Sequence, residues 1–489
     1  MYSPNKPYTV WCTNCWNEDD WDGRDYSIEY DESKPFFEQF EKVWNSVPKI
    51  GLMHVRTVNS EYLNISADNK NCYMIVESSN NEDCTHCYWI QLSTDLVDCS
   101  FTNKVERSYE SDDCYDSYGL QYSKGCYSCT DSYFLTDSRG CTDCIGCINL
   151  RNKSHHIFNQ AYSKEEYEKI KKELQLDTYS GVQAFRKKYD EFINGIPHKF
   201  AKITQGVNST GNYLSNVKNV TNCFHTYEAE DCKYCVHAWR TAKDNMDCDT
   251  VGRVSVNNYQ CVNSGQEASN NMMSSLVWTT SFATYSWHCL GSQSLFGCVG
   301  LRQQKYCILN KQYSKEEYEA VTFKIINKLK ETGEYGQFFP AYISCFGYNE
   351  ACVQEQFPLT KEEALDQGFK WEDTPRGTYG KETKKWEEVP DSIHDTQFDV
   401  AKEIFVCEKC EKNYKIIENE FLFYKKLSIP LPHMCPDCRH NRRFVARGPN
   451  KLWHRSCMNT GCQNEFETSY SPECPEIIYC ESCYQKEVM

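Results

Sequence analysis

The sequence predicts a mainly β chain made of two tandem parallel β-solenoid modules. Each module is expected to be capped by an α-helix, with zinc ribbons at the C-terminus and half a ribbon at the N-terminus. Three observations lead to this prediction: 31 cysteines that fall in separate groups, a segment that recurs at an offset of 151 residues, and steps of 12 or 15 residues between cysteines. Short strands at a fixed period, separated by polar turns, are typical of solenoids.

Length and charge limit the class of protein. The 489 residues correspond to several domains of about 150 residues each. Lys and Arg total 53 against 69 Asp and Glu, a net charge of −16, which disfavours a general polyanion binder. The sequence has no apolar run long enough to span a bilayer and no secretory leader, so we expect a soluble, cytoplasmic protein with no membrane partner. In that compartment cysteines favour metal sites or buried thiols over disulfides.

Residues 1–50 are predicted to form a partial zinc ribbon and a linker. Tyr2-Ser3-Pro4 followed by Cys12-x2-Cys15 has the spacing of Tyr470-Ser471-Pro472 followed by Cys480-x2-Cys483, at an offset of 468. No knuckle precedes Tyr2. We therefore expect Cys12 and Cys15 to take ligands from elsewhere, to bind zinc across a subunit interface, or to stay without metal, and a start codon assigned too late explains the half ribbon equally well.

Residues 51–200 and 201–335 are predicted to be the two solenoid modules. The segment 150–168 recurs as 301–319, and both copies end in the sequence YSKEEYE. In the first copy the cysteines lie at positions 72, 84, 87, 99, 114, 126, 129 and 141. Cysteine suits a narrow interior because it acts as a small, buried hydrophobe. Zinc held between turns by CxxC pairs (84/87, 126/129, 141/144 and 232/235) and redox-active thiols are the alternatives.

Helices are predicted to close each module. Ser163-x-x-Glu166 and Ser314-x-x-Glu317 are capping boxes, which mark helix N-termini. In the second helix an apolar stripe at helical spacing suits the open end of a solenoid; it consists of Tyr318, Val321, Ile325 and Leu329. A further helix around residues 182–192 is expected to connect the modules.

Residues 336–400 are predicted to be a linker domain, and residues 401–489 tandem zinc ribbons. The first set of ligands is Cys407, Cys410, Cys435 and Cys438, and the second is Cys457, Cys462, Cys480 and Cys483. Two knuckles with this spacing place four thiolates around one tetrahedral ion. Because four thiolates leave no position open for water, the zinc is expected to be structural, and zinc is the cofactor we predict.

The chain resembles an uncharacterised family of cysteine-rich zinc-ribbon and β-solenoid proteins predicted from metagenomic bacterial and large-phage genomes. The resemblance covers nearly the whole chain and is carried by residues 346–349, residues 357–363, residues 429–439 and the two YSKEEYE segments. In that family a fuller ribbon precedes the YSP element, which this sequence lacks. The resemblance implies architecture and brings no established activity.

Three functions follow from these patterns. We expect a zinc-binding scaffold or interaction protein whose duplicated cysteine-rich faces bind a protein or glycan partner, with a homo-oligomer as an open alternative. The alternative is nucleic-acid binding through a basic track in the C-terminal ribbons, formed by Arg439, Arg442, Arg443, Arg447, Lys451, Trp453 and Arg455. A thiol redox enzyme is the second alternative, although none of the common catalytic motifs occurs and the chain is not expected to be an enzyme.

Overall fold

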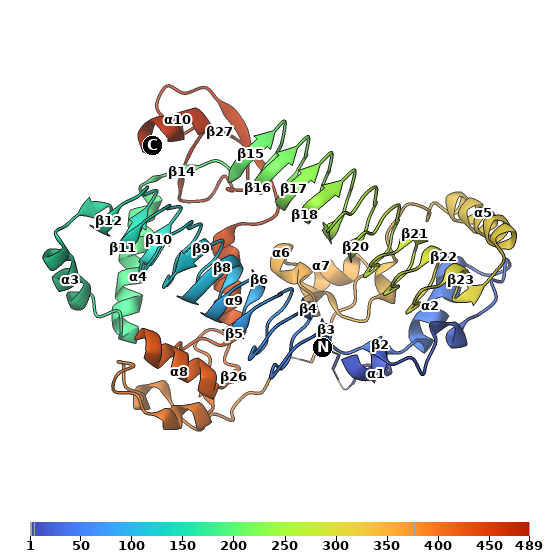
Figure 1. Cartoon of the computed structure of the whole chain (residues 1–489), viewed down its shortest axis with the longest axis horizontal. Helices are drawn as coiled ribbons and strands as arrows, with labels where there is room; N and C mark the ends of the chain where they lie inside the picture. The colour runs from blue at the N-terminus through green and yellow to red at the C-terminus, as the bar shows by residue number, and fades with distance from the viewer. Residues whose placement is uncertain (1, 4, 375–376, 489) are drawn as a thin grey trace.

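The computed structural model describes residues 2–3, 5–374 and 377–488. Two stacks of short parallel strands dominate it, and they lie side by side along the long axis of the molecule (Figure 1). We call them region 1 (residues 54–157) and region 2 (residues 203–308). The prediction of a strand-rich chain with parallel sheets is confirmed. Pro4 of the predicted N-terminal match lies outside the described residues.

Region 1 pairs each short strand with a segment twelve positions further along the chain. His54 pairs with Ser66, Glu82 with Thr94, and Thr142 with Ser154, all in parallel. Isolated bridges at the same spacing connect the strands where they are interrupted. The strands are β3 (His54–Val55), β4 (Ser66–Ala67), β5 (Glu82–Thr85), β6 (Tyr88–Gln91), β7 (Thr94–Val97), β8 (Ser100–Tyr109), β9 (Tyr115–Tyr118), β10 (Tyr133–Thr136), β11 (Thr142–Ile148) and β12 (Ser154–Ile157).

The backbone of region 1 bends at nearly every third residue. Asp68, Asn71, Met74 and Glu77 all have φ between 50° and 56°, in the left-handed region. A bend at every third position and a register of twelve positions give four corners in each turn of the chain. Because a left-handed conformation costs a non-glycine residue about 1–2 kcal/mol, the interstrand hydrogen bonds and the packed interior must compensate. The frequent Asn, Asp and Gly at corners lower this cost.

The side chain after each corner points into the interior. Cys72, Ile75, Ser78 and Asn81 form one such set, and each is at most 3% exposed. The Cys72 Sγ donates to the carbonyl of Lys70 at 3.3 Å, as the Ser78 Oγ donates to the carbonyl of Val76 at 2.8 Å. Cysteine and serine therefore have the same role here, since each fills a narrow space and donates a hydrogen bond to a backbone carbonyl two residues earlier.

Region 2 follows the same plan with a longer turn in its middle. Gly211 pairs with Cys223 twelve positions later, but Val236 pairs with Asp249 thirteen positions later. The additional residue lies at one corner, where Arg240 and Thr241 both have positive φ. The strands are β15 (Ile203–Val207), β16 (Gly211–Lys218), β17 (Cys223–Glu230), β18 (Val236–Lys243), β19 (Asp249–Gly252), β20 (Val262–Gly265), β21 (Ser281–Thr284), β22 (Gln293–Phe296) and β23 (Lys305–Ile308).

Both regions end in the same way. β13 (Gln160–Ala161) pairs antiparallel with β12, and β24 (Lys311–Gln312) pairs antiparallel with β23. The helices α3 (Lys164–Glu173) and α5 (Lys315–Glu331) follow, and both begin with the predicted capping boxes. In α5, Ile325 and Leu329 of the predicted stripe are buried in a core that includes residues of region 2.

Each connecting helix packs against the end of a region. α4 (Tyr179–Asn194) buries Val182, Phe185 and Tyr189 against region 1 and leads through β14 (Pro197–Lys199) into region 2. α2 (Phe36–Ser46) buries its aromatic face against the end of region 2 and leads through β2 (Lys49–Ile50) into region 1. Before α2 lie β1 (Val10–Trp11) and α1 (Thr13–Asn17).

The remainder of the chain crosses back over both regions. Between residues 336 and 404 the described residues include the short α-helices α6 (Val353–Gln356) and α7 (Lys361–Asp366) besides 3-10 turns, and α7 begins at the predicted Thr360 capping box. The last part contains β25 (Phe405–Val406), β26 (Asn413–Tyr414), α8 (Glu418–Leu427), α9 (Pro436–Arg447), β27 (Trp453–Ser456), β28 (Glu465–Thr468), β29 (Ile477–Tyr479) and α10 (Glu481–Val488). No helix in the described part of the chain is long and apolar enough to cross a membrane.

Candidate functional site

The first predicted set of cysteines comes together. The Sγ atoms of Cys407, Cys410, Cys435 and Cys438 all lie within 4.8 Å of one another, and those of Cys410 and Cys435 are 3.6 Å apart. This arrangement can hold one metal ion.

Local structure sets this geometry. Cys407 and Cys410 lie in the turn between β25 and β26, which pair antiparallel. Cys435 is the N-cap of α9 and Cys438 is in its first turn. The backbone N–H of Cys435 donates to the Cys407 Sγ at 3.2 Å. Burial raises the pKa of the Cys407 thiol, but this and other backbone N–H donors outweigh burial and bring the pKa to about 7, which favours the thiolate that binds metal.

The second predicted set also comes together. The Sγ atoms of Cys457, Cys462, Cys480 and Cys483 lie within 4.8 Å of one another, and those of Cys462 and Cys480 are 3.9 Å apart. The backbone N–H of Cys480 donates to the Cys457 Sγ at 3.3 Å, which repeats the contact between Cys435 and Cys407. Cys474 stays outside the cluster and accepts a hydrogen bond from Arg455 at 3.1 Å.

Cys12 and Cys15 form only a pair. Both are exposed, and their Sγ atoms are 3.4 Å apart at the start of α1. β1 pairs in parallel with β2, as β29 pairs in parallel with β14. The pair therefore has the setting of Cys480 and Cys483, but within the described residues no group of three or more ligands includes it. Whether it binds metal stays a prediction.

The cysteines inside the two regions are buried free thiols. Within the described part of the chain none of them belongs to a group of three or more possible metal ligands. Cys84, Cys99 and Cys126 are completely buried, and burial raises the pKa of each thiol well above its usual value. Because the thiolate is the nucleophile in disulfide exchange, this setting disfavours a redox role for these three cysteines.

Three of the predicted nucleic-acid-binding arginines are buried in ion pairs. Arg439 is 0% exposed, and its guanidinium contacts Asp98 at 2.7 Å and Glu420 at 2.8 Å. Arg443 lies 3.5 Å from the same Asp98. Arg439, Arg443 and Arg447 recur at every fourth position, so they share the face of α9 that packs on region 1. They do not form an exposed basic track, because their charges are already paired with carboxylates of the protein.

Arg447 lies where α9 meets both regions. Its Nη1 is 3.0 Å from both carboxylate oxygens of Asp112 in region 1, and its Nη2 is 2.8 Å from the Nδ1 of His225 in region 2. The guanidinium also stacks between Phe101 and Tyr213, at 3.6 and 4.1 Å from their ring centroids. Arg447 therefore connects the first cysteine cluster to both parallel regions.

The other predicted basic residues are scattered. Arg442 forms an ion pair with Glu110, which also pairs with Arg186. Arg455 donates to the carbonyl of Ser471 at 2.9 Å. Lys451 is exposed and lies over the ring of Trp453, 5.0 Å from its centroid. Nucleic-acid binding by these last residues stays a prediction, without the continuous track that first suggested it.

The acidic partners of α9 were not predicted. Asp98 and Glu110 occupy equivalent places in adjacent turns of region 1, and both lie at corners with positive φ. The pairing of β7 with β8 sets this register. The regular spacing of the two carboxylates is a signal in the sequence, but only the packing of α9 shows what they bind.

Comparison with known proteins gives little further information. No protein-family model and no curated protein matches the chain. Twelve chains among the solved structures match. One of them, described as a "putative acetyltransferase" from Desulfovibrio desulfuricans G20, is 10% identical, and the match covers 49% of this chain and 64% of that one. The match thus spans just under two thirds of that chain's length, and its TM-score is 0.12.

Proposed function

We propose that the chain is a cytoplasmic zinc-binding scaffold protein, in which two tetrathiolate zinc sites fix a pair of cysteine-lined β-solenoid modules that present their faces to a protein or glycan partner. One observation carries this proposal: each four-cysteine cluster lies where the C-terminal part of the chain attaches to the parallel regions. The sites would then determine how the two modules are held together.

The donor chemistry favours zinc. In a regular tetrahedron, thiolates about 2.3 Å from one zinc ion lie about 3.8 Å from one another. The Sγ–Sγ distances of 3.6 Å for Cys410 and Cys435 and 3.9 Å for Cys462 and Cys480 agree with this value. Four sulfur ligands leave no position open for water or substrate, which indicates a structural role. Bound zinc would add to folding stability, because the unfolded chain has no preformed site.

The first site would anchor α9 on region 1. Cys435 and Cys438 define the start of α9, and the buried ion pairs of Arg439 with Asp98 and Glu420 follow directly. Breaking a buried pair by removing one partner costs about 3–5 kcal/mol. The ribbon therefore needs an ordered helix start to keep these charges paired.

The second site would anchor the connection between the modules. β29 pairs with β14 from Pro197 to Lys199, immediately before region 2. Tyr484 in α10 donates to the Oδ1 of Asn149 in region 1 at 2.7 Å. A zinc ion held by Cys480 and Cys483 would thus tie one short segment to both modules.

The solenoid and its duplication are supported by matching contacts at the two module ends. Asn159 accepts from the N–H of Ile148 and donates to its carbonyl, both at 3.0 Å. Asn310, the equivalent residue of the second copy, does the same with Val299 at 2.8 Å. The offset of the contacts equals the offset of the sequences, and the steady register supports stacked turns. These matches favour modules close to the predicted boundaries of 51–200 and 201–335.

The side chains exposed on the outer face of the turns suggest the kind of partner. Tyr62 is 46% exposed and Met74 is 39% exposed, and they occupy equivalent places in adjacent turns, so they repeat on one face. Rigid aromatic and flexible apolar side chains of this kind contribute strongly to interfaces. A flat, repetitive face suits an extended protein segment or a glycan chain better than a small molecule.

The proposal is tested by comparing native and denatured masses of the full chain purified without chelator. Two zinc ions per chain are expected, and double Cys-to-Ser variants at positions 407/410 and 457/462 should each lose one. Cys474→Ser is the matched control and should keep both. A chain without zinc would overturn the zinc scaffold, and glycan arrays and pull-downs with and without the variants would then test the partner.

A further inference from the structure

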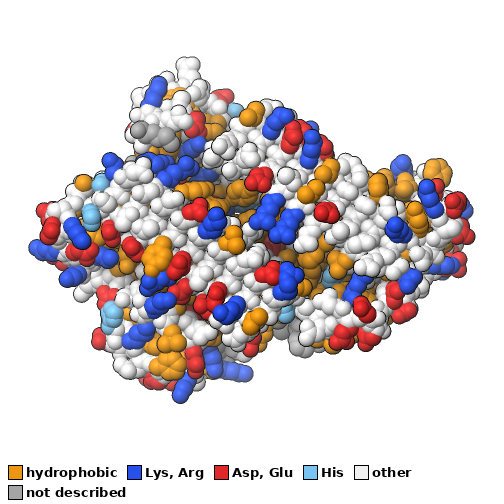
Figure 2. All heavy atoms as spheres, in the orientation of Figure 1, with side chains coloured by type: hydrophobic (Ala, Val, Ile, Leu, Met, Phe, Trp, Pro, Cys, Tyr) orange, Lys and Arg blue, Asp and Glu red, His pale blue; other side chains and the backbone are white. Residues whose placement is uncertain are grey.

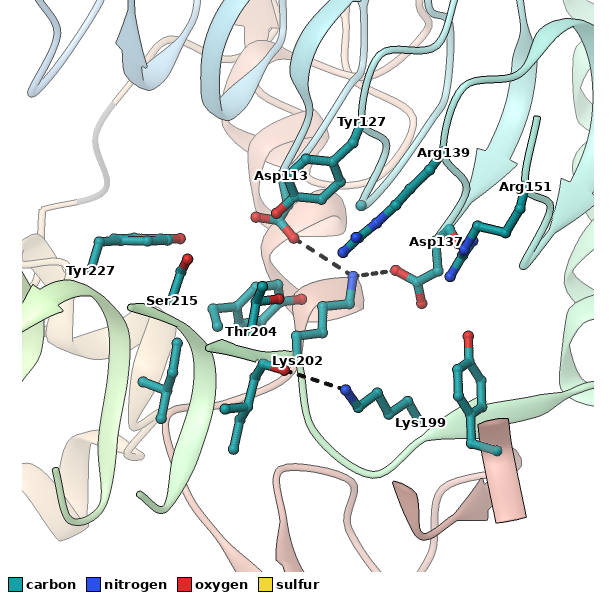
Figure 3. A pocket seen from close by; sticks show the side chains of 15 residues that line it. Asp113, Tyr127, Asp137, Arg139, Arg151, Lys199, Lys202, Thr204, Ser215 and Tyr227 are labelled. Atoms are coloured by element: carbon teal, nitrogen blue, oxygen red, sulfur yellow. Dashed lines mark hydrogen bonds and ion pairs between the residues drawn. The ribbon is translucent and has the colours of Figure 1, made fainter. Parts of the chain in front are cut away.

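We infer that a cavity between the two regions is a binding site for a small oxyanion, the phosphoryl or carboxylate group of a polar ligand. The cavity has a volume of about 110 Å3 and opens between the turns of region 1, the start of region 2 and α10. Figure 3 shows its lining side chains. Figure 2 shows basic and hydrophobic side chains gathered at this junction, below the C-terminal lobe.

The lining carries an excess of positive charge. Four basic side chains, Arg139, Arg151, Lys199 and Lys202, face two acidic ones, Asp113 and Asp137, a net of +2 in a chain whose net charge is −16. The acidic pair already has partners, because Lys202 lies 2.5 Å from Asp137 and 3.6 Å from Asp113, and Arg447 lies 3.9 Å from Asp113.

Lys199 is occupied as well. Its Nζ forms an ion pair with Glu481 at 2.7 Å. The excess therefore resides on Arg139 and Arg151.

These two arginines are stacked without a counter-charge. Arg139 pairs with Arg151 in the parallel ladder of region 1, so they leave adjacent turns on the same face (Figure 3). Like charges at directly paired positions of a sheet are destabilising. Among the described residues no carboxylate lies within ion-pair distance of either arginine. Arg139 contacts the ring of Tyr127 at 4.9 Å, and Arg151 donates to the carbonyls of Asp137 and Leu150.

Hydroxyl groups face the arginines across the cavity. Thr204 in β15 and Ser215 in β16 are paired in register, and both line the cavity with Tyr227. Guanidinium groups bind oxyanions through two parallel hydrogen bonds, and hydroxyls supply the remaining donors. The two sides come from different regions, so the cavity exists only when the regions are joined.

The size of the cavity limits what enters it. Its volume of about 110 Å3 compares with the about 10–15 Å3 that a cavity needs to hold one water molecule. An inorganic phosphate or a carboxylate headgroup fits this space, while the rest of a larger ligand would extend outward past Arg139, which is exposed. A sugar phosphate and a sugar acid share the required chemistry.

A neighbouring lysine, Lys124, belongs to the same cluster of charged groups. Burial, and to a lesser degree the charge of Lys202, lowers the pKa of Lys124 to about 8. Lys124 donates to the carbonyl of Ala446 and has Asp112 and Asp137 close by. An anion in the cavity would add negative charge to this cluster.

The test is calorimetric titration of the full, zinc-loaded chain with inorganic phosphate, glucose 6-phosphate, glucuronate and, as the neutral reference, glucose. Saturable binding of at least one anion and none of glucose is expected. Arg139→Gln should weaken that binding by about tenfold or more, since a hydrogen bond to a charged group contributes about 1.5–3 kcal/mol. Within the described part of the chain Arg139 makes no side-chain hydrogen bond that the substitution would break, so the variant should fold.

Arg253→Gln, which removes an exposed arginine that does not line the cavity, is the matched control and should bind like the parent. Binding of the two phosphates alone would identify a phosphoryl ligand, and binding of glucuronate alone a sugar acid. The inference is overturned if no anion binds saturably or if Arg139→Gln binds as tightly as Arg253→Gln. Zinc content, measured on the same samples, reports separately on the proposed scaffold role.

Discussion

Arg447 and Asp112 are separated by 335 residues, yet the Arg447 Nη1 lies 3.0 Å from both oxygens of the Asp112 carboxylate. The same guanidinium reaches His225 of region 2. Arg447 and Asp112 are 4% and 5% exposed, so the pair is shielded from solvent. It joins three parts of the chain that are distant in sequence: region 1, region 2 and the helix that begins at the first cysteine cluster.

Replacing Arg447 should destabilise the whole molecule. Arg447→Ala leaves Asp112 buried without a partner, which costs about 3–5 kcal/mol in the free energy of unfolding. Arg447→Lys keeps the charge but loses the planar contact with the two rings, so its effect should be smaller. Urea unfolding monitored by circular dichroism measures the free energy of unfolding of both variants. A loss below about 1 kcal/mol for Arg447→Ala, the usual range of exposed pairs, would show that the pair is not structural.

The zinc content of cysteine variants should show which of the three groups of cysteines outside the parallel regions bind zinc. Chains with Ser at 407/410 or at 457/462 should retain one zinc ion, because a cluster with two remaining thiolates binds weakly. The Cys12→Ser/Cys15→Ser chain should retain both, since within the described residues no third ligand approaches Cys12 and Cys15. A third zinc in the parent monomer, or a zinc shared by two copies and lost in this variant, would contradict that expectation.

Local spacing in the sequence predicted the clusters, because a CxxC knuckle fixes its own geometry and β25, β26 and α9 complete it. The regular steps between cysteines likewise predicted that cysteines fill a narrow interior, where Cys72 and Cys84 are 2% and 0% exposed. The corners were not predicted: Trp89 and Phe101 adopt positive φ although aromatic residues give no such signal. Here the repetition of the turn overrides the preference of the single residue.

The ion pairs between residues distant in the chain could not be predicted from the sequence. Arg439, Arg443 and Arg447 look like a free basic segment because no acidic residue lies near them in sequence. Asp98 is 341 residues from Arg439, and Asp112 is 335 residues from Arg447. The cavity beside Arg139 is unpredictable for the same reason, since its two walls belong to different regions. Patterns of short period are visible in one sequence, whereas contacts between distant elements depend on tertiary packing.

Glu110 should make stability depend on pH in the acid range. Although burial opposes its ionisation, Arg442 and Arg186 lower the pKa of Glu110 from 4.5 to about 2. A carboxyl whose folded pKa is depressed stabilises the fold above its unfolded pKa and loses that contribution as pH falls toward the folded value. At about 1.4 kcal/mol per pKa unit, this contribution is about 3.5 kcal/mol at most.

Comparison of the parent with Glu110→Gln isolates this effect from other acid-sensitive groups. The difference in unfolding free energy should be constant from pH 7 to about 4.5 and should shrink below that, because only the parent gains a proton at position 110. Thermal melts in matched buffers measure the difference. A gap that stays unchanged down to pH 3 would contradict the depressed pKa, and Glu61→Gln, which removes an exposed carboxyl on the surface of region 1, is the control.

The interior thiols should tolerate serine but not a branched apolar residue. Cys129 donates to the carbonyl of Tyr127 at 3.4 Å and accepts from the N–H of Cys141 at 3.5 Å. Ser117, one turn earlier, makes the same two kinds of contact, donating to Tyr115 at 2.8 Å and accepting from Cys129 at 3.1 Å. Cys129→Ser should therefore keep both hydrogen bonds and change the free energy of unfolding by about 1 kcal/mol or less.

Cys129→Val is larger by about one methyl group and has neither a donor nor an acceptor. It leaves the N–H of Cys141 without its acceptor, which costs about 1–3 kcal/mol, whereas the carbonyl of Tyr127 keeps the hydrogen bond from the N–H of Gly140 at 2.9 Å. The ranking of the three chains by urea midpoint decides between two roles for cysteine. If the valine chain had the same midpoint as the parent and the serine chain a lower one, the thiols would act only as apolar filling. If the serine chain were close to the parent and the valine chain clearly below both, cysteine would be retained because it is small and completes the hydrogen bonds of the turn.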